Sequence, residues 1–341
     1  MGVRIEDVAA AAGVSMKTVS RVLNHEPNVA QATRERVEAA VAELGYRPHQ
    51  SARVLAGNRS YLIGLLYDNP STNYLMEVEL GALDTCLAHH YHLMLIPLKY
   101  EGGKVAGQLE SLIGQTRIDG VLLTPPLTDT PELLSALETM RVPWASLSAR
   151  RANQRIGVII DEQAAARDMV AHLVDLGHRH IAHIRGHPAH GASDWRMAGY
   201  RQGLESAGLP IVPGLIVEGL FSFESGHAAA VQLLDLPRPP TAIFAANDDM
   251  AAGAISAICE RGFSVPADIS VSGFDDTPIA TQIYPALTTV RQPSRDMGRV
   301  AAQELLKAIR SPKDGETVVM PYELQLRRST SEPPVGNQQA G

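Results

Sequence analysis

The chain has 341 residues, enough for two or three domains and a packed core. Its 45% hydrophobic and 20% charged residues are typical of a globular protein, and its apolar runs are too short to span a bilayer. Cys86 and Cys259 are far apart and are the only cysteines, which argues against a disulfide framework and favours the cytoplasm.

The charge of the chain is unevenly distributed. A formal net charge of -7 argues against a nucleic-acid binder when the chain is taken as a whole. Residues 1–60, however, carry eight basic and six acidic side chains, a net charge of +2, which leaves -9 for the rest. The sequence therefore predicts a small cationic head, suited to a polyanion, on an acidic body.

Three short amphipathic helices are predicted in the head. The first begins near Ile5 and ends at Gly13, and Ser15 can cap the second. The third spans about residues 33–44 and stops at Gly45. The second helix has apolar residues on one face and polar and basic residues on the other. Two helices joined by a tight glycine turn in this way indicate a helix-turn-helix.

The stretch YRPHQSARVLAG, residues 46–57, is open to two interpretations. Pro48 favours a linker, whereas the uninterrupted run from Ala52 to Ala56 favours a short helix. A solvated linker would not be expected to carry a large apolar side chain such as that of Leu55. A short core helix has no use for Arg53 beside it.

From Tyr61 onward, apolar strand-like segments alternate with helical stretches. The strand-like segments are LIGLLY, YHLMLIP, DGVLLT, WASL, IAHI, TAIFAA and ISVSGF. Helices are predicted at about residues 75–89, 162–176, 196–207, 225–235 and 249–261. The alternation predicts parallel sheets with helices on both faces, arranged as two lobes with a ligand crevice beyond the strand ends. The final SEPPVGNQQAG lacks apolar periodicity and predicts a disordered tail.

Several motifs, in order and at the right spacing, resemble one family. The stretch IEDVAAAAGVSMKTVSRVLN, followed by TRERVEAAVAELGYRP, resembles the head of the LacI/GalR (lactose and purine repressor) family of bacterial transcription regulators. The similarity continues to about residue 328 through LGHRHIAHIRG, RMAGYRQGL, FAANDDMAAGA, ADISVSGFDDT and LTTVRQP.

The resemblance implies a fold and its boundaries. A small all-α helix-turn-helix head is expected at residues 1–46 and a hinge helix or linker at 47–60. An α/β body like a periplasmic binding protein, with two doubly wound parallel-sheet lobes, is expected at 61–328. Lobe 1 would comprise about residues 61–161 and 291–320, and lobe 2 about 162–290 and 321–328. The disordered tail would be 329–341.

The resemblance also implies a homodimer that binds palindromic double-stranded operator DNA in the bacterial cytoplasm, associated with the nucleoid. Met16, Lys17 and Arg21 match base-reading residues, and Arg21 can pair with guanine through two hydrogen bonds. The alternative is that Lys17 and Arg21 form an ordinary solvated face. Backbone and hinge contacts with DNA are assigned to Ser15, Thr18, Ser20, Asn24, His49, Ala52, Arg53 and Leu55.

The hinge and the helix caps carry further expectations. Leu55 resembles a wedge for the minor groove, which would make residues 46–57 a linker off DNA and a short helix on it. The alternative is that Leu55 packs on the body. His49 stands where many relatives have Asn. Arg4 and Ala30 stand where relatives usually have a capping hydroxyl; each lost cap costs about 0.5–2 kcal/mol, so the isolated head is expected to be poorly folded.

The body is expected to sense a small molecule. A guanidinium, an amide and a carboxylate suit carbohydrate hydroxyls, so a sugar or glycoside is predicted and a purine is less natural. Ser148 stands where sugar-binding relatives often have Asp. Asn69 and Tyr74 could reach the cleft or belong to a capped loop, and Trp195 could stack on a sugar or pack the lobe surface. The positions that match the family's effector contacts are Ser148, Arg196, Phe221, Asn247, Asp275 and Gln292.

Catalytic and metal sites are not predicted. The neighbouring carboxylates at residues 248–249 and 275–276 resemble glycosidase pairs, but adjacent residues point apart. The histidine-rich stretches 89–92 and 178–190 lack the partners and spacing of zinc sites. No GxSxG elbow and no GxxxxGK[ST] loop is present, so nucleophilic hydrolysis and nucleotide hydrolysis lack a motif. Neither a metal nor a cofactor is expected.

The interpretation that accounts for head, hinge and body is a repressor of carbohydrate-utilisation genes that a sugar inducer releases from its operator. A corepressor-dependent or activating regulator is the alternative within the family. A sugar-binding protein without DNA function would share the body, but it would not need the cationic head.

Overall fold

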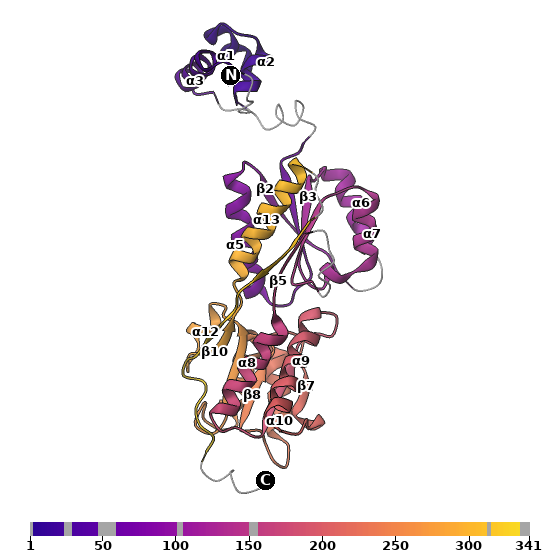
Figure 1. Cartoon of the computed structure of the whole chain (residues 1–341), viewed down its shortest axis with the longest axis vertical. Helices are drawn as coiled ribbons and strands as arrows, with labels where there is room; N and C mark the ends of the chain where they lie inside the picture. The colour runs from indigo at the N-terminus through magenta and orange to yellow at the C-terminus, as the bar shows by residue number, and fades with distance from the viewer. Residues whose placement is uncertain are drawn as a thin grey trace. The chain divides into compact units, whose positions relative to one another are not determined.

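The computed structural model describes residues 3–23, 29–46, 59–100, 105–149, 156–311 and 315–334. The chain divides into two compact units, Met1–Ser60 and Tyr61–Gly341 (Figure 1). We call the first unit the head and the second the body. In the described residues, no helix is both long enough and apolar enough to cross a membrane.

The head consists of α1 (Ile5–Ala12), α2 (Met16–Leu23) and α3 (Gln31–Leu44). Gly13 ends α1 in the left-handed conformation, with φ 64°, and turns the chain directly into α2. The buried side chains of all three helices form one small core around Val8, Val19 and Val37. The predicted all-α helix-turn-helix head is therefore confirmed.

The helix caps of the head follow the sequence only in part. The backbone N–H of Arg4 donates to the Asp7 carboxylate at 2.8 Å, so α1 gains half of a capping box without a hydroxyl residue. The Ser15 hydroxyl accepts from the backbone N–H of Thr18 at 3.2 Å and caps α2, as predicted. Ala30 offers no capping side chain to α3.

The first sheet of the body has six parallel strands in the order β11-β5-β4-β3-β1-β2. Helices α5 (Thr72–Ala88) and α13 (Ser294–Arg310) cover one face, and α6 (Val105–Thr116) and α7 (Pro131–Thr139) cover the other (Figure 1). The strands are β1 (Leu62–Tyr67), β2 (His92–Pro97), β3 (Gly120–Leu123), β4 (Trp144–Leu147), β5 (Gly157–Ile160) and β11 (Thr317–Met320), with a 3-10 turn η1 at Leu127–Asp129.

The second sheet also has six strands, in the order β12-β10-β9-β8-β6-β7, all parallel except β12, which runs antiparallel to β10. Helices α8 (Glu162–Asp175) and α9 (Gly191–Ser206) cover one face, and α10 (Phe223–Leu234) and α11 (Asp248–Glu260) the other. The remaining elements are β6 (Ile181–Arg185), β7 (Ile216–Glu218), β8 (Ala242–Ala245), β9 (Ser270–Asp275), β10 (Thr288–Arg291), β12 (Glu323–Gln325), α12 (Ile279–Gln282) and a 3-10 turn η2 at Pro213–Leu215.

Helices α5 and α13 approach so closely that only glycine fits at their contact. A Cβ atom on Gly81 would lie 1.8 Å from the Arg295 carbonyl oxygen, and one on Gly298 would lie 2.2 Å from that of Val78. These two glycines let α5 and α13 pack closely against each other on the same face of the first sheet.

The chain passes three times between the two sheets. It crosses from β5 to α8 at Asp161, from β10 to α13 at residues 292–293, and from β11 to β12 at residues 321–322. Each sheet therefore contains segments from distant parts of the sequence. The predicted body of two doubly wound, mainly parallel lobes is confirmed.

The sequence pattern did not reveal every element. Strands β5, β7, β10, β11 and β12 are short, and some of them are polar, so their apolar signal is weak. The predicted start of the disordered tail also differs from the structure, because residues 329–334 are described and packed. The Ser329 side chain is fully buried, donates to the Val271 carbonyl oxygen at 2.6 Å and accepts from the Thr288 backbone N–H at 2.7 Å. Residues 335–341 lie outside the described residues.

Candidate functional site

The outer face of α2 carries the candidate base-reading side chains. Val19 and Val22 are buried against the rest of the head, whereas Met16 and Lys17 are exposed. Arg21 lies one helical turn after Lys17 and so shares its face. The structure thus gives α2 the polar, cationic outer face that its spacing predicts.

The hydroxyl residues at the start of α2 also bond to each other. The Ser15 and Thr18 hydroxyls lie 2.9 Å apart, which fixes both side chains at the helix N-terminus, and Ser20 is partly exposed farther along. A helix N-terminus with hydroxyl groups is suited to phosphate oxygens. The other predicted DNA contacts, Asn24, His49, Ala52, Arg53 and Leu55, lie outside the described residues.

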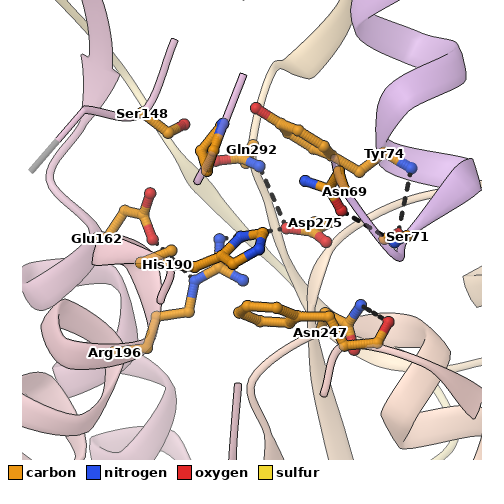
Figure 2. Close-up of a pocket in the computed structure, with 13 residues that line it drawn as sticks. Asn69, Ser71, Tyr74, Ser148, Glu162, His190, Arg196, Asn247, Asp275 and Gln292 are labelled. Atoms are coloured by element: carbon orange, nitrogen blue, oxygen red, sulfur yellow. Dashed lines mark hydrogen bonds and ion pairs between the residues drawn. The ribbon is translucent and has the colours of Figure 1, made fainter. Parts of the chain in front are cut away.

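A narrow cavity lies between the two sheets of the body (Figure 2). Its free volume of about 30 Å³ is enough for about two water molecules. Most of its lining follows the carboxyl ends of parallel strands, where sheets of this type place ligands. The lining residues are Asn69, Ser71, Tyr74, Pro125, Ser148, Glu162, His190, Ala192, Arg196, Phe221, Asn247, Asp275 and Gln292. We call this the inner cavity.

Arg196 is the centre of the inner cavity. Its Nε donates to Glu162 Oε2 at 2.8 Å, Nη1 donates to the Ala246 carbonyl oxygen at 2.5 Å, and Nη2 lies 3.4 Å from Asp275 Oδ1. The guanidinium also lies over the Phe274 ring, 3.7 Å from its centroid. A buried cation held on every side in this way is fixed in one orientation.

The electrostatics of the inner cavity favour neutral ligands. The buried Arg196 faces two buried carboxyl groups, Glu162 and Asp275. Burial raises the pKa of Asp275 well above its usual value, against the opposing effect of Arg196. Burial also lowers the pKa of His190 to about 3, so this ring is neutral near pH 7. No cationic side chain in the lining is without a carboxylate partner, so an anionic ligand would meet no uncompensated positive charge.

Three buried polar atoms of the cavity lining make no well-formed hydrogen bond with the described residues. They are the Tyr74 hydroxyl, the Ser148 hydroxyl and the Gln292 Oε1. The Gln292 Nε2, by contrast, donates to Asp275 at 3.2 Å. Because an unpaired buried polar atom costs about 1–3 kcal/mol, these atoms are suited to bind a polar ligand or ordered water. They offer two hydroxyls and one acceptor.

Asn247 and Phe221 are tied to each other. Asn247 Oδ1 accepts from the Met250 backbone N–H at 3.0 Å and caps α11, while its Nδ2 donates to the Phe221 carbonyl oxygen at 3.0 Å. Phe221 has φ 62°, and two further lining residues, Ser148 and Asp275, have φ 50° and 110°. Left-handed backbone at non-glycine residues costs about 1–3 kcal/mol each and is typical of functional sites.

Trp195 does not line the inner cavity. It lies on α9 beside Arg196, is 40% exposed, and faces an adjoining hollow that shares Ser148 and Glu162 with the inner cavity. The other predicted effector residues, Asn69, Tyr74, Ser148, Arg196, Phe221, Asn247, Asp275 and Gln292, all line the inner cavity.

Sequence reasoning missed five lining residues: Ser71, Pro125, Glu162, His190 and Ala192. Glu162 begins the helix that follows β5, a strand which the apolar pattern did not reveal. Ser71 caps α5 through its Oγ, 3.4 Å from the Tyr74 nitrogen, so the loop is capped and reaches the cavity at once. The loop is therefore capped and also forms part of the cavity lining.

The neighbouring carboxylates have separate partners, as adjacent side chains that point apart should. Asp248 accepts from Thr289 Oγ1 at 2.6 Å and from the Thr277 backbone N–H at 2.8 Å. Asp249 bonds to residues of the first lobe instead, and Asp276 pairs with Arg291 at 2.8 Å. Within the part of the chain that the structure describes, no three His, Cys, Asp or Glu side chains gather as a metal site.

Comparison with known proteins agrees with this organisation. Residues 4–49 match the model of bacterial regulatory proteins of the lacI family, and residues 170–330 match that of the periplasmic binding protein-like domain. Catabolite control protein A of Priestia megaterium is 36% identical over 335 residues, which cover 97% of this chain and 100% of that protein.

Solved structures give the same result. The lac repressor dimer bound to operator and the anti-inducer ONPF superimposes with a TM-score of 0.81 at 31% identity, covering 97% of this chain and 100% of that one. The complex of the transcriptional regulator CelR with cellobiose has a TM-score of 0.74 at 31% identity, covering 96% and 99%. From these matches along nearly its whole length, the chain belongs to the LacI family of bacterial regulatory proteins.

Proposed function

We propose that this protein is a sequence-specific transcriptional regulator that represses carbohydrate-utilisation genes and is released from its operator by a sugar or glycoside. The observation that carries the proposal is the cationic outer face of α2 in a chain that also builds a polar cavity with unpaired hydroxyls. The first feature suits a major groove and the second a polyol.

The relatives support both halves of the proposal. One solved relative is a repressor dimer on operator DNA with an anti-inducer, and another holds cellobiose. By analogy, two copies of this chain would place their α2 helices in two half-sites of a palindrome. Met16, Lys17 and Arg21 would read bases, while Ser15, Thr18 and Ser20 would bind phosphates.

We assign no catalytic role to the body. The relatives are transcriptional regulators, and Asp248, Asp249 and Asp276 are each bonded to a separate partner. The protein would act in the bacterial cytoplasm, on nucleoid DNA. The division into head, hinge and two lobes with the boundaries given above is part of the same proposal.

Effector binding would act through the positions of the two lobes. The inner cavity, with about 30 Å³ free, is too small for a sugar ring, so the lobes must part before a ligand enters and close around it afterwards. A ligand that stabilises one lobe arrangement shifts the population of the DNA-competent state. Induction is proposed from the sugar-like cavity, although linkage permits either sign.

The effector would be neutral. Glu162 and Asp275 already pair with Arg196, so a sugar phosphate would bring an anion into a buried site whose one guanidinium is already paired. Hydroxyl groups, by contrast, would satisfy Tyr74, Ser148 and Gln292. A free monosaccharide and its phosphate, such as glucose and glucose 6-phosphate, separate the two cases in a thermal-shift assay.

A binding selection tests the proposal as a whole. The full-length protein is equilibrated at low salt with a library of randomised DNA duplexes, and bound duplexes are recovered and sequenced. A palindromic consensus is expected, and Arg21→Ala should lose one specified base at a cost of about 1–3 kcal/mol. Without any DNA affinity, the regulator proposal fails. Neutral sugars are then added to the complex, and tighter operator binding would reverse the proposed sign of the response.

A further inference from the structure

A second hollow adjoins the inner cavity. It has a free volume of about 380 Å³, within the size range of small-molecule sites. Its lining residues are Ser148, Ala149, Ile159, Ile160, Asp161, Glu162, Gln163, Trp195 and Val319. We call it the outer cavity. Ser148 and Glu162 line both cavities, so the two hollows are neighbours that share these side chains in their walls.

The two cavities differ in chemistry. The inner cavity gathers the guanidinium, carboxyl and hydroxyl groups described above, whereas the outer one has walls from Ile159, Val319 and the indole of Trp195. Trp195 is 40% exposed and Val319 is 63% exposed, so both apolar surfaces face solvent in this structure. A flat, partly apolar group would remove both of them from water.

The Ser148 hydroxyl lies at the junction of the cavities. It is buried and makes no well-formed hydrogen bond with the described residues. Glu162 uses Oε2 to hold Arg196. Figure 2 shows its carboxyl group on the same side of the cavity as Ser148. A polar linking atom, such as a glycosidic oxygen, would meet the Ser148 hydroxyl as the ligand passes from one cavity to the other.

We infer that the outer cavity is a second subsite of the same effector site and that it holds a second sugar ring or an apolar aglycone joined to the sugar in the inner cavity. The inference rests on the proposed sugar-sensing function. It narrows the effector to glycosides, because a free monosaccharide would leave the Trp195 wall uncovered.

A third hollow also adjoins the inner cavity and is the alternative place for the second group of the ligand. It shares Asn69 and His190 with the inner cavity and has a free volume of about 650 Å³. Its lining includes Asp68 and Lys99, and it contains Tyr100, which is 40% exposed, as Trp195 is. The outer cavity also has two acidic residues, Asp161 and Glu162, but Glu162 is paired with Arg196 and no described lysine or arginine lines that cavity, whereas an apolar group in this hollow would displace water from Lys99. Tyr100 therefore offers a matched aromatic control for Trp195.

The experiment compares methyl and phenyl glycosides of glucose, galactose, mannose and xylose, measured by calorimetry on the full-length protein. For the sugar that binds, the phenyl glycoside should bind roughly tenfold tighter than the methyl glycoside. Trp195→Ala should remove this advantage and leave the affinity for the methyl glycoside within about twofold. Tyr100→Ala should leave both affinities unchanged.

A second variant and a fluorescence measurement test whether Trp195→Ala acts on ligand binding directly or only by disturbing the fold. Val319→Trp should fill the outer cavity from its exposed wall, and so abolish the phenyl advantage without weakening the methyl glycoside. Since the chain has two tryptophans, Trp144→Phe leaves Trp195 as the single tryptophan, and its emission should shift with the phenyl glycoside and little with the methyl glycoside.

The outcomes separate the inference from the proposed function. Equal binding of methyl and phenyl glycosides, or a phenyl advantage that Tyr100→Ala removes and Trp195→Ala retains, overturns the outer subsite while the sugar sensor stands. Failure of every neutral glycoside to bind overturns the sugar sensor and the subsite with it.

Discussion

The Asp249 carboxylate accepts a hydrogen bond from the Ser71 hydroxyl at 2.5 Å, and this contact joins the two lobes. Ser71 caps α5 in the first lobe, whereas Asp249 lies in the first turn of α11 in the second. Asn73 donates to the other oxygen of the same carboxylate at 2.6 Å. Because Ser71 also lines the inner cavity, the contact would link lobe closure to the proposed effector site.

Asp249→Asn should weaken closure of the lobes. An asparagine has one carbonyl oxygen and one amide group, so the Ser71 hydroxyl and the Asn73 amide can no longer both find an acceptor. Loss of a charge-assisted bond costs about 1.5–3 kcal/mol, and the effector concentration for half-release from the operator should rise by roughly tenfold. A mobility-shift titration measures it. Asp235→Asn, in an exposed ion pair, is the control, and an equal response in both variants would exclude the cross-lobe role.

Arg196→Ala should reduce stability and abolish effector binding together. Removing the guanidinium leaves Glu162 and Asp275 buried without their cation. Breaking a buried ion pair from one side costs about 3–5 kcal/mol, whereas Arg261→Ala in the exposed pair with Asp235 should cost less than about 1 kcal/mol. Urea unfolding of the two variants provides the comparison. A loss for Arg196→Ala as small as that for Arg261→Ala would contradict the structural role assigned here.

Mild acid should destabilise the body through His183. Burial lowers the pKa of this ring to about 4, against an ordinary 6.5, and its Nδ1 lies 2.8 Å from the Phe244 carbonyl oxygen. The unfolded chain therefore takes up a proton before the native state does. The contribution of His183 is fully present above about pH 6.5 and falls by about 1.4 kcal/mol per pH unit toward pH 4.

The measurement is the difference in unfolding free energy between wild type and His183→Gln at several pH values. Taking the difference cancels Asp248, whose pKa burial raises to about 7 and whose effect has the opposite sign, adding stability as the pH falls through 7. A difference that does not change with pH would show that His183 titrates alike in both states.

Ala30→Ser should stabilise the head. Ala30 stands at the N-cap of α3 with extended ψ of 140° and no side chain to bond the first turn, while α1 already has Asp7. A serine should add about 0.5–2 kcal/mol. Fragment 1–60 of the natural sequence is expected to be poorly folded and to show a weakly cooperative thermal unfolding transition by circular dichroism. The serine variant should unfold more cooperatively. A natural fragment that melts well above room temperature would refute the missing-cap argument.

The sequence was most informative where one residue type had one physical purpose. Gly13 and Gly45 mark helix ends because only glycine adopts their positive φ at little cost. Arg196 and Asp275 could be placed in the cavity because their positions match effector contacts of the LacI/GalR family. Glu162 and Ser71 could not, since an acid or a serine at a helix start is ordinary, and only the crossings between sheets bring them beside Arg196.

The packed end of the chain is a second example. Ser329 and Ser331 have no apolar signal, yet His178 Nε2 lies 2.9 Å from the Ser331 carbonyl oxygen and fixes this segment beside β9. Composition predicts disorder there because it counts only burial of apolar side chains. Hydrogen bonds between small polar side chains and a buried histidine leave no periodic pattern in a sequence.

The late crossings between the sheets also have a consequence for biosynthesis. Strand β11 pairs with β5 in the first sheet and β12 pairs with β10 in the second, and both lie after residue 316. A chain emerging from the ribosome at about 5–20 residues per second can complete its head early, but neither sheet is complete until nearly all 341 residues have been synthesised. The DNA-binding head is thus made long before the sensor that controls it.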